Sequence, residues 1–377
     1  MVLERLKMNH TNKNIKIFII AGEVSGDVLG AKIMREMPGV RFVGIGGQNM
    51  TAAGLKPLFL MSDLSVMGIT EVLSHARTLS MRIKQTISAI IDEKPDVVLT
   101  IDSPGFAKSV VKSVRDKGVL HNTKFYHIVA PQVWAWGAKR ARKYAKIFDK
   151  LYAFFDFERP YFEKYGLTTV AVGHPIADGL DKYKKTTKGK KIITFVPGSR
   201  MSEVKKLLPV FQKTVDLLGD NYRYIIPTVE TTDAYVREHI ATWKIKPELV
   251  SSDQRYNVYA NTHTAVVASG TVSAELAIMH IPTIVVYKMN PLTTLLAHIL
   301  LRIKWASLVN ILMNKTIFPE LLGSKAKPNL IARWVKKLDS QSVRTDMINE
   351  LNQADKKWMQ SAVMPARVIA DDIIKSI

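Results

Sequence analysis

The chain has 377 residues, of which 47% are hydrophobic and 23% charged, and it contains no cysteine. This length and composition predict two folded domains with substantial cores rather than a disordered chain. The lack of cysteine excludes disulfides, thiolate nucleophiles and cysteine-type zinc sites. The formal net charge of +21 favours nucleic acid, an anionic membrane or a phosphorylated substrate as partner, although a Lys-rich genome gives the same charge without any function.

No run of about 18 uninterrupted apolar residues is found, so no transmembrane helix is expected. Residues 1–14 are polar and basic, without the apolar region of a secretory signal, and are interpreted as a basic extension. The sequence has no HExxH motif, no cluster of histidines and no Gly-x-Ser-x-Gly elbow, so metal and covalent chemistry find little support.

The first domain is expected to begin with an apolar strand over 15–21, followed by the turn Gly22-Glu23-Val24-Ser25-Gly26-Asp27 and a helix over 28–37. This turn is not a P-loop, because no Gly-Lys-Ser/Thr follows at the required spacing. A second strand over 41–45 leads into another glycine-rich turn. Asn49 stands there in place of the third glycine of the dinucleotide fingerprint, which disfavours a Rossmann dehydrogenase.

An apolar stretch over 64–73 stands beside a basic segment over 77–91. An apolar patch bordered by cations is typical of a segment at a membrane interface, but burial in the domain core explains it equally well. The patch consists of Met67, Ile69, Val72 and Leu73.

A continuous apolar strand over 96–101 is typical of a parallel strand that is buried on both faces. It brings Asp102 to its carboxyl end, where open α/β sheets bind their ligands, so Asp102 is a candidate general base. A cap on the following helix, over 106–117, is the simpler interpretation of this residue.

The Lys-rich segment 181–191 is interpreted as a linker, because the strand–helix alternation restarts after it. A strand over 192–196 runs into Gly198-Ser199-Arg200 and a helix over 204–218, which makes an anion-binding turn. A later strand over 264–268 runs into Ser269-Gly270-Thr271 and another helix. Such a turn favours a phosphate, although an ordinary strand–turn–helix corner has the same pattern.

Glu275 lies four residues after Thr271, one helical turn further on, where its carboxylate can accept hydrogen bonds from a ribose diol. The apolar segment 291–304 is too short to span a bilayer, and it either lies on one or packs as a core helix. These patterns divide the chain into an extension over 1–14, a first domain over 15–180, a linker over 181–191, a second domain over 192–350 and a helical tail over 351–377.

Ten short motifs at these turns and elsewhere resemble, as a set, those of the lipid-A-disaccharide synthases, a family of inverting glycosyltransferases with the GT-B architecture. No single motif is specific, but the ten occur in the family's order over most of 15–325. The motifs are AGEVSGD (21–27), FVGIGGQNM (42–50), SVMGITEVL (65–73), IDSPGF (101–106), APQVWAW (130–136), VGHP (172–175), PGSR (197–200), ASGTVSAEL (268–276), SLVNIL (307–312) and PELL (319–322).

The resemblance implies an α/β GT-B fold, in which two Rossmann-like domains flank an interdomain cleft. The enzyme is then expected to transfer 2,3-diacylglucosamine from its UDP derivative to 2,3-diacylglucosamine 1-phosphate (lipid X), which gives a β1→6 disaccharide and UDP. Neither a metal nor a cofactor is expected. The alternatives are another GT-B UDP-sugar enzyme, either a soluble-acceptor transferase or an epimerase, and a non-catalytic basic protein that binds nucleic acid.

The resemblance also implies roles for single residues. Asp102 is expected to deprotonate the acceptor hydroxyl, with Glu23 as the alternative base. Arg200 is expected to neutralise the diphosphate. The remaining residues expected to bind the UDP donor are Gly198, Ser199, Ser269, Gly270, Thr271, Glu275 and Asn310.

Both implied substrates carry acyl chains, so the enzyme is expected in the cytoplasm, peripherally attached to the inner face of the cytoplasmic membrane. The patch Met67, Ile69, Val72 and Leu73 and the positive charge are expected to serve this contact. No nucleic-acid partner is expected, and a homodimer is compatible with the sequence. Two positions depart from many relatives: Gly105 replaces an acidic residue, and Gly323 replaces a glutamine.

Overall fold

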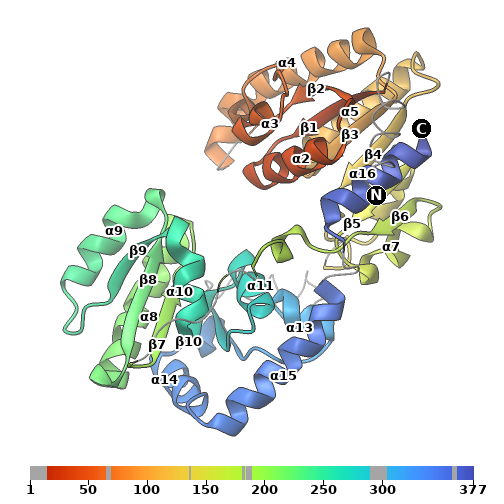
Figure 1. Cartoon of the computed structure of the whole chain (residues 1–377). Helices are drawn as coiled ribbons and strands as arrows, with labels where there is room; N and C mark the ends of the chain where they lie inside the picture. Colours follow the sequence, from red (N-terminus) through yellow and green to blue (C-terminus); the bar gives the residue numbers. More distant parts are fainter. Residues whose placement is uncertain are drawn as a thin grey trace. The chain divides into compact units, whose positions relative to one another are not determined.

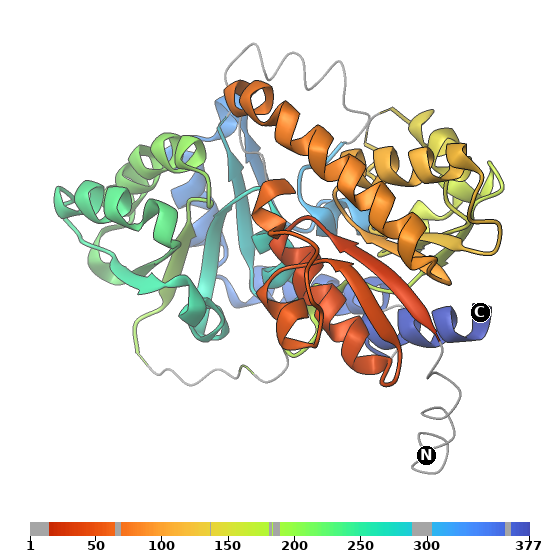
Figure 2. The same ribbon diagram turned by 90° about the horizontal axis from the view of Figure 1, so that it is seen from above.

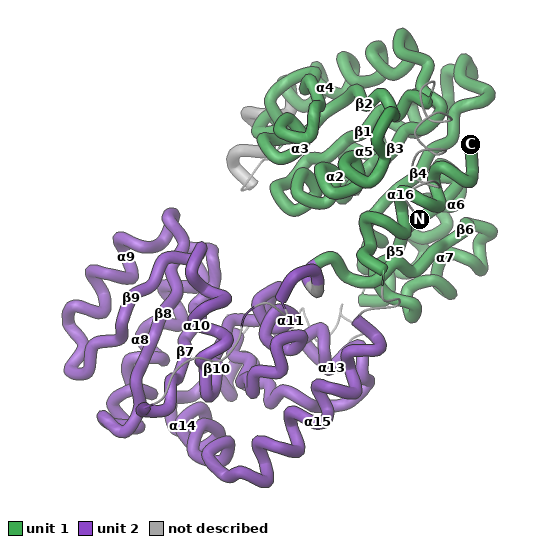
Figure 3. The backbone as a smooth tube through the Cα atoms, viewed as in Figure 1, with its two compact units in different colours: residues 1–175, 359–377 green, residues 176–358 purple. Residues whose placement is uncertain are grey.

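The computed structural model describes residues 15–64, 69–135, 137–180, 183, 189–288, 304–358 and 363–377. The chain forms two compact units, residues 1–175 with 359–377 (unit 1) and residues 176–358 (unit 2), coloured separately in Figure 3. The expected basic extension, most of the expected linker 181–191 and nearly all of the apolar segment 291–304 lie outside the described residues. Met67 and the side chains of Ile69, Val72 and Leu73 also lie outside them.

Within the described residues, unit 1 contains a parallel six-stranded sheet in the order β2-β1-β3-β4-β5-β6. The first and third strands of the chain lie in the middle and are buried along almost their whole length, as their uninterrupted apolar sequences predict. The strands are β1 (Lys16–Ala21), β2 (Arg41–Ile45), β3 (Val97–Ile101), β4 (Lys124–Ile128), β5 (Lys150–Ala153) and β6 (Thr168–Ala171).

Helices cover both faces of this sheet, since successive side chains of a strand point to opposite faces. Ile17 and Ile19 enter one core, with side chains of α2 (Val24–Glu36) and α3 (Gln48–Ala52). Phe18 and Ile20 enter the other core, which is covered by α4 (Ile69–Glu93), α5 (Pro104–Lys117), α6 (Arg140–Ala145) and α7 (Pro160–Glu163). The layers can be followed in Figures 1 and 2.

The last helix, α16 (Pro365–Ser376), belongs to unit 1 and lies beside α2 (Figures 1 and 2). Ile369 and Ile373 are fully buried in the core that also contains Ile17. Asp372 accepts hydrogen bonds from Lys150 Nζ at 2.7 Å and from Tyr152 Oη at 2.8 Å. The segment expected as one helical tail is therefore divided, because its first part continues α15 (Gln341–Trp358) in unit 2.

The described part of unit 2 contains a second parallel six-stranded sheet, in the order β12-β11-β10-β7-β8-β9. The strands are β7 (Ile192–Val196), β8 (Arg223–Thr228), β9 (Glu248–Ser251), β10 (Thr262–Ala268), β11 (Thr283–Tyr287) and β12 (Glu320–Leu322). The helices, besides α15, are α8 (Met201–Leu218), α9 (Glu230–Ala241), α10 (Arg255–Asn261), α11 (Thr271–Ile278), α13 (Leu308–Met313) and α14 (Pro328–Lys337).

Short 3₁₀ helices complete both units: η2 (Met61–Leu64), η3 (Asp156–Glu158), η4 (Pro175–Ala177), η5 (Gly219–Asn221), η6 (Ser252–Gln254) and η7 (Gly323–Lys325). Among the described helices, none combines the length and the apolar character that crossing a bilayer requires.

Candidate active-site residues in the two units

Asp102 stands directly after β3, at the carboxyl edge of the sheet of unit 1. Its backbone and that of Ser103 are left-handed, with φ of 54° and 46°, a conformation that is uncommon for residues other than glycine and is often found at functional sites. The cap position of α5 is taken by Ser103, so Asp102 is not the helix cap that its position in the sequence suggested. Its Oδ1 instead accepts a hydrogen bond from Ser103 N at 2.9 Å.

Glu23 occupies the neighbouring turn, between β1 and α2, with an extended backbone at the cap position of α2. The two turns meet closely: a Cβ atom added to Gly22 would lie 2.1 Å from Ser103 Oγ, so only glycine fits there. Burial raises the pKa of Glu23, and the negative charge of Asp102 raises it further. Burial also raises the pKa of Asp102, against the hydrogen bond from Ser103 N. Both pKa values thus move upward, the direction that makes a carboxylate a stronger general base.

Asp27, from the same motif as Glu23, has a structural task. Its side chain is 2% exposed and accepts hydrogen bonds from Gly47 N (2.7 Å), Asn49 N (2.9 Å), Asn49 Nδ2 (2.9 Å) and Met50 N (3.0 Å). Burial alone would raise the pKa of Asp27, but these hydrogen bonds outweigh it and lower the pKa. Asp27 thereby fastens the start of α3 to α2. Asp27 and Asn49 each belong to a motif noticed in the sequence, but their contact is seen only in the fold.

Glu158 is a buried carboxyl group that the sequence analysis missed. It accepts hydrogen bonds from Trp134 Nε1 at 3.2 Å and from Phe155 N at 3.1 Å. Burial raises the pKa of Glu158 to about 7, although these hydrogen bonds oppose the shift. The ring of His174 lies 5.6 Å from that of Phe155, and burial lowers the pKa of His174 to about 4. The only local signal was a glutamate within an aromatic-rich segment, which does not distinguish a buried carboxylate from an exposed one.

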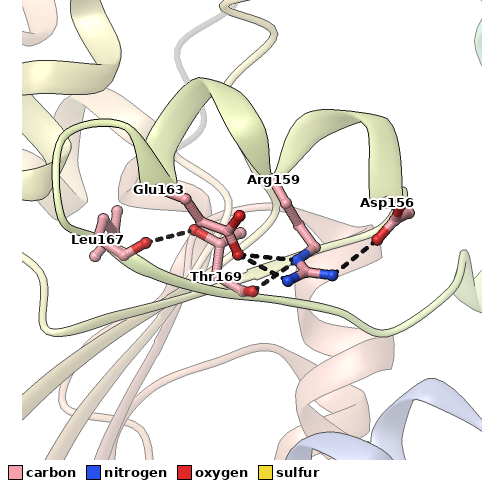
Figure 4. A network of polar contacts seen from close by, with 5 residues as sticks. All are labelled: Asp156, Arg159, Glu163, Leu167 and Thr169. Carbon is pink, nitrogen blue, oxygen red and sulfur yellow. Dashed lines mark hydrogen bonds and ion pairs between the residues drawn. The ribbon is translucent and has the colours of Figure 1, made fainter.

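The segment that follows Glu158 is fixed by Arg159, whose polar contacts are drawn in Figure 4. Arg159 Nη1 donates to Asp156 Oδ1 at 3.0 Å, Nη2 donates to Glu163 Oε1 at 2.9 Å, and Nε donates to Thr169 O at 3.1 Å. These contacts tie η3 and α7 to β6. The carboxyl group of Glu158 is therefore held by a well-anchored segment.

In unit 2, Gly198, Ser199 and Arg200 connect β7 to α8. Gly198 has φ of 103°, and a Cβ atom there would lie 2.4 Å from Glu203 Oε2, so glycine is required. The Arg200 side chain is 79% exposed and contacts Glu203 Oε1 at 3.3 Å. A pocket of about 140 Å³ at this turn is rich in cations and is lined by Arg200, Ser202, Glu203, Lys206, Leu207, Tyr287 and Lys288.

Ser269 and Gly270 form the turn between β10 and α11, whose first residue is Thr271. Gly270 occupies the cap position and supplies no side-chain hydrogen bond to the helix. The first N–H groups of α11 are therefore left without a side-chain cap, as an anion site requires. Ser269 Oγ donates to Ala306 O at 3.3 Å, which links this turn to the segment before α13.

Glu275 lies on α11 and is 8% exposed. Its Oε1 accepts hydrogen bonds from Tyr256 Oη at 2.9 Å and from Arg255 Nη2 at 3.4 Å. Both donors belong to α10, a short helix that the sequence analysis did not single out. One oxygen of the carboxyl group is thus hydrogen-bonded inside unit 2.

Asn310 is fully buried on α13, and its side-chain amide is fully used. Nδ2 donates to Phe318 O and Glu320 Oε1, and Oδ1 accepts from Ile317 N and Phe318 N, at distances of 2.8 to 2.9 Å. Glu320 also accepts from Ala306 N, Ser307 N and Ser307 Oγ, each at 2.8 Å. Asn310 and Glu320 therefore fix the segment that contacts Ser269.

The structure brings the predicted residues together in two groups. Asp102 and Glu23 lie in adjacent turns of unit 1, whereas the predicted donor-binding residues lie in unit 2. In the described ranges, no three His, Asp or Glu side chains are grouped so that they could hold a metal ion.

Two Rossmann-like units, each built on a parallel six-stranded sheet with helices, define the GT-B fold. Solved structures with this fold are similar over 96% of the chain. A UDP-GlcNAc 2-epimerase from Neisseria meningitidis has a TM-score of 0.63 at 10% identity, with 99% of it covered. MurG from Acinetobacter baumannii has a TM-score of 0.60 at 12% identity, also with 99% covered.

The family model described as lipid-A-disaccharide synthetase matches residues 17–368. The chain is 37% identical to the lipid-A-disaccharide synthase of Rhodospirillum centenum, with 97% of this chain and 95% of the relative covered. It is 36% identical to that of Rickettsia canadensis, with 96% and 97% covered. The chain belongs to the lipid-A-disaccharide synthase family and is a hexosyltransferase of lipid A biosynthesis. The family resemblance seen in the sequence is confirmed, and the alternative functions are not favoured.

Proposed function

We propose that the chain transfers 2,3-diacylglucosamine from its UDP derivative to the 6-hydroxyl of 2,3-diacylglucosamine 1-phosphate, and releases UDP. The observation that carries this proposal is the family match over residues 17–368, which spans both Rossmann-like units. The sugar-nucleotide enzymes with the same fold support a nucleotide-linked donor by analogy alone.

In this proposal Asp102 is the general base. The acceptor oxygen gives its proton to the Asp102 carboxylate and bonds to the anomeric carbon of the donor, while the bond from that carbon to the UDP oxygen breaks. A single in-line displacement inverts the configuration, so no covalent intermediate with the enzyme is needed. The raised pKa of Asp102 supports the role, because a base is most effective when its pKa lies near the working pH. Glu23, whose pKa is also raised, is the alternative base.

Unit 2 is proposed to bind UDP. Arg200 is exposed beside a cation-rich pocket and carries a charge that can neutralise the leaving diphosphate. The uncapped turn at Ser269, Gly270 and Thr271 offers N–H groups to phosphate oxygens, and Gly198 and Ser199 offer a second such turn. Glu275 is proposed to accept hydrogen bonds from the ribose. The buried amide of Asn310 is proposed to support donor binding indirectly. It bonds to Glu320, which holds the Ala306–Ser307 segment against the Ser269 turn.

The enzyme is proposed to work in the cytoplasm on the inner face of the cytoplasmic membrane. Two substrates with acyl chains and a chain with a formal net charge of +21 support attachment to an anionic lipid surface. The patch Met67, Ile69, Val72 and Leu73 is proposed to enter this surface. The homodimer stays a prediction from the sequence.

The test is a product assay with the purified chain, UDP-2,3-diacylglucosamine and 2,3-diacylglucosamine 1-phosphate in mixed micelles. Disaccharide 1-phosphate and UDP are expected in equal amounts, and only when the acceptor is present. Replacing the donor with UDP-N-acetylglucosamine and omitting detergent separates this activity from that of a soluble-acceptor transferase or an epimerase. Absence of the disaccharide in the complete mixture would refute the proposal.

A further inference from the structure

The carboxylate of Glu275 is held through one of its two oxygens. Both hydrogen bonds, from Tyr256 Oη at 2.9 Å and Arg255 Nη2 at 3.4 Å, reach Oε1. In the part of the chain that the structure describes, no donor reaches Oε2 of this residue. The side chain is 10% exposed, so it is not fully sealed from solvent. One oxygen is therefore tethered, and the other remains for a ligand.

The two donors to Glu275 are themselves fixed. Arg255 Nη1 donates to Ser252 O at 3.0 Å, and Arg255 Nη2 donates to Tyr256 Oη at 2.8 Å. The guanidinium carbon lies 4.2 Å from the centre of the Tyr256 ring, a cation–π contact. Arg255, Tyr256 and Glu275 therefore form a connected group in which each member restricts the rotamers of the next.

The protonation states in this group suit its hydrogen bonds. Burial raises the pKa of Tyr256 to about 12, and the charge of Glu275 contributes to the shift, so the hydroxyl keeps its proton and donates it. Burial lowers the pKa of Arg255, but the charges and hydrogen bonds of Glu275 and Tyr256 together outweigh it, and the net shift is upward. The Arg255 guanidinium lies 3.4 Å from Glu275 Oε1, so the contact between them is charge-assisted.

We propose that Tyr256 and Arg255 are positioning residues that orient Glu275, so that its Oε2 receives the ribose hydroxyls of UDP. The inference rests on the proposed function, in which Glu275 binds the ribose. A flexible glutamate loses side-chain entropy when it binds a ligand, whereas a glutamate that is already held loses little. Tyr256 and Arg255 thus add to recognition of the ribose without touching it.

The experiment measures the affinity of the full chain for UDP and for 2′,3′-dideoxy-UDP by titration calorimetry. The dissociation constant for the dideoxy analogue, divided by that for UDP, gives a ratio that reports the contribution of the ribose hydroxyls alone. Hydrogen bonds to a charged acceptor predict that wild-type protein binds UDP about tenfold or more tightly than the dideoxy analogue. Glu275→Gln is expected to bring this ratio close to one.

Tyr256→Phe keeps the ring and removes only the hydroxyl that holds Glu275. It is expected to lower the ratio by about threefold or more, because UDP binds more weakly while the dideoxy analogue binds as before. Arg255→Gln is expected to lower the ratio in the same way, and it provides a second test if the first variant folds poorly. The matched control is Tyr224→Phe, which also removes a tyrosine hydroxyl in unit 2. That hydroxyl donates to Gly219 O at 2.6 Å, whereas the hydrogen bonds to Glu275 come from Tyr256 and Arg255.

Each outcome decides a different point. If Glu275→Gln lowers the ratio and Tyr256→Phe and Arg255→Gln do not, the positioning role is wrong while the ribose role of Glu275 stands. If Tyr256→Phe weakens both ligands equally, its hydroxyl is merely structural and the inference is also overturned. If Glu275→Gln leaves the ratio unchanged, the ribose assignment fails and the positioning role fails with it. Family membership and the product assay are independent of all three results.

Discussion

Glu320 is predicted to stabilise unit 2 through the segment that leads into α13. Its carboxylate accepts four hydrogen bonds of 2.8 to 2.9 Å, from Ala306 N, Ser307 N, Ser307 Oγ and Asn310 Nδ2. Glu320→Ala removes all four acceptor contacts. A hydrogen bond to a charged group contributes about 1.5 to 3 kcal/mol, but water replaces part of the loss at this half-buried site, so we expect a cost of about 3 to 5 kcal/mol.

Glu320→Gln separates the effect of these hydrogen bonds from the effect of side-chain size. The glutamine oxygen can replace Oε1, which has three of the four donors, but its NH₂ group then faces the N–H of Ala306. One donor is left unsatisfied, so the expected cost is about 1 to 3 kcal/mol. Glu248→Gln is the matched control, since that carboxylate is 48% exposed and pairs with Arg223; a change of less than about 1 kcal/mol is expected there.

Urea denaturation, followed by circular dichroism at several protein concentrations, measures these free energies of unfolding. UDP affinity should fall most in Glu320→Ala, less in Glu320→Gln and least in Glu248→Gln. The reason is that Glu320 holds the backbone of Ala306 and Ser307, and Ser269 Oγ donates to Ala306 O. The reasoning is refuted if Glu320→Ala lies within about 1 kcal/mol of wild type, or if Glu320→Gln costs as much as Glu320→Ala.

Three further predictions concern the remaining sites. Arg200→Ala should weaken UDP binding about tenfold or more with little loss of stability, because its side chain is exposed; unchanged UDP affinity in calorimetry would contradict this. For Glu158, whose pKa is about 7 rather than 4.5, the folded chain retains a proton that the unfolded chain loses, so stability should decline by up to about 3 kcal/mol as pH rises from about 4.5 to 7. Urea titrations at the two pH values should show no such decline for Glu158→Gln. An equal change in the free energy of unfolding for wild type and variant would disprove the role of Glu158. Met67→Ser with Leu73→Ser should reduce co-sedimentation with anionic vesicles while UDP affinity stays at the wild-type level, and undiminished sedimentation would exclude the patch as a membrane contact.

Much of the fold could be predicted from the sequence, because parallel strands buried on both faces are continuous apolar runs. The strand expected over 41–45 has the bounds of β2, and that over 96–101 differs from β3 by one residue. β12 was missed, since three residues are too few to carry a pattern. The assignment of α16 to unit 1 was also out of reach, because an amphipathic helix shows that it is buried but not against which core.

The predicted site residues were found through turns, which are local, whereas the residues that support them are distant in sequence. Glu275 and Tyr256 are 19 residues apart, and Asp27 and Asn49 are 22 apart. Asn310 and Glu320 were each noticed in a motif, but only the fold shows that one uses its amide to hold the other. The contact of Asn310 with the donor stays a prediction, whereas the fold shows its amide bonded to residues 317–320.

The role of Asp102 is tested most directly by Asp102→Asn, which keeps the size of the side chain and removes its ability to take a proton. The account predicts that the rate of disaccharide formation at saturating substrates falls about a hundredfold or more, while the dissociation constant for UDP stays within about twofold of wild type, because the donor-binding residues lie in unit 2. Wild-type turnover by Asp102→Asn, with loss of turnover in Glu23→Gln, would contradict the assignment and make Glu23 the base.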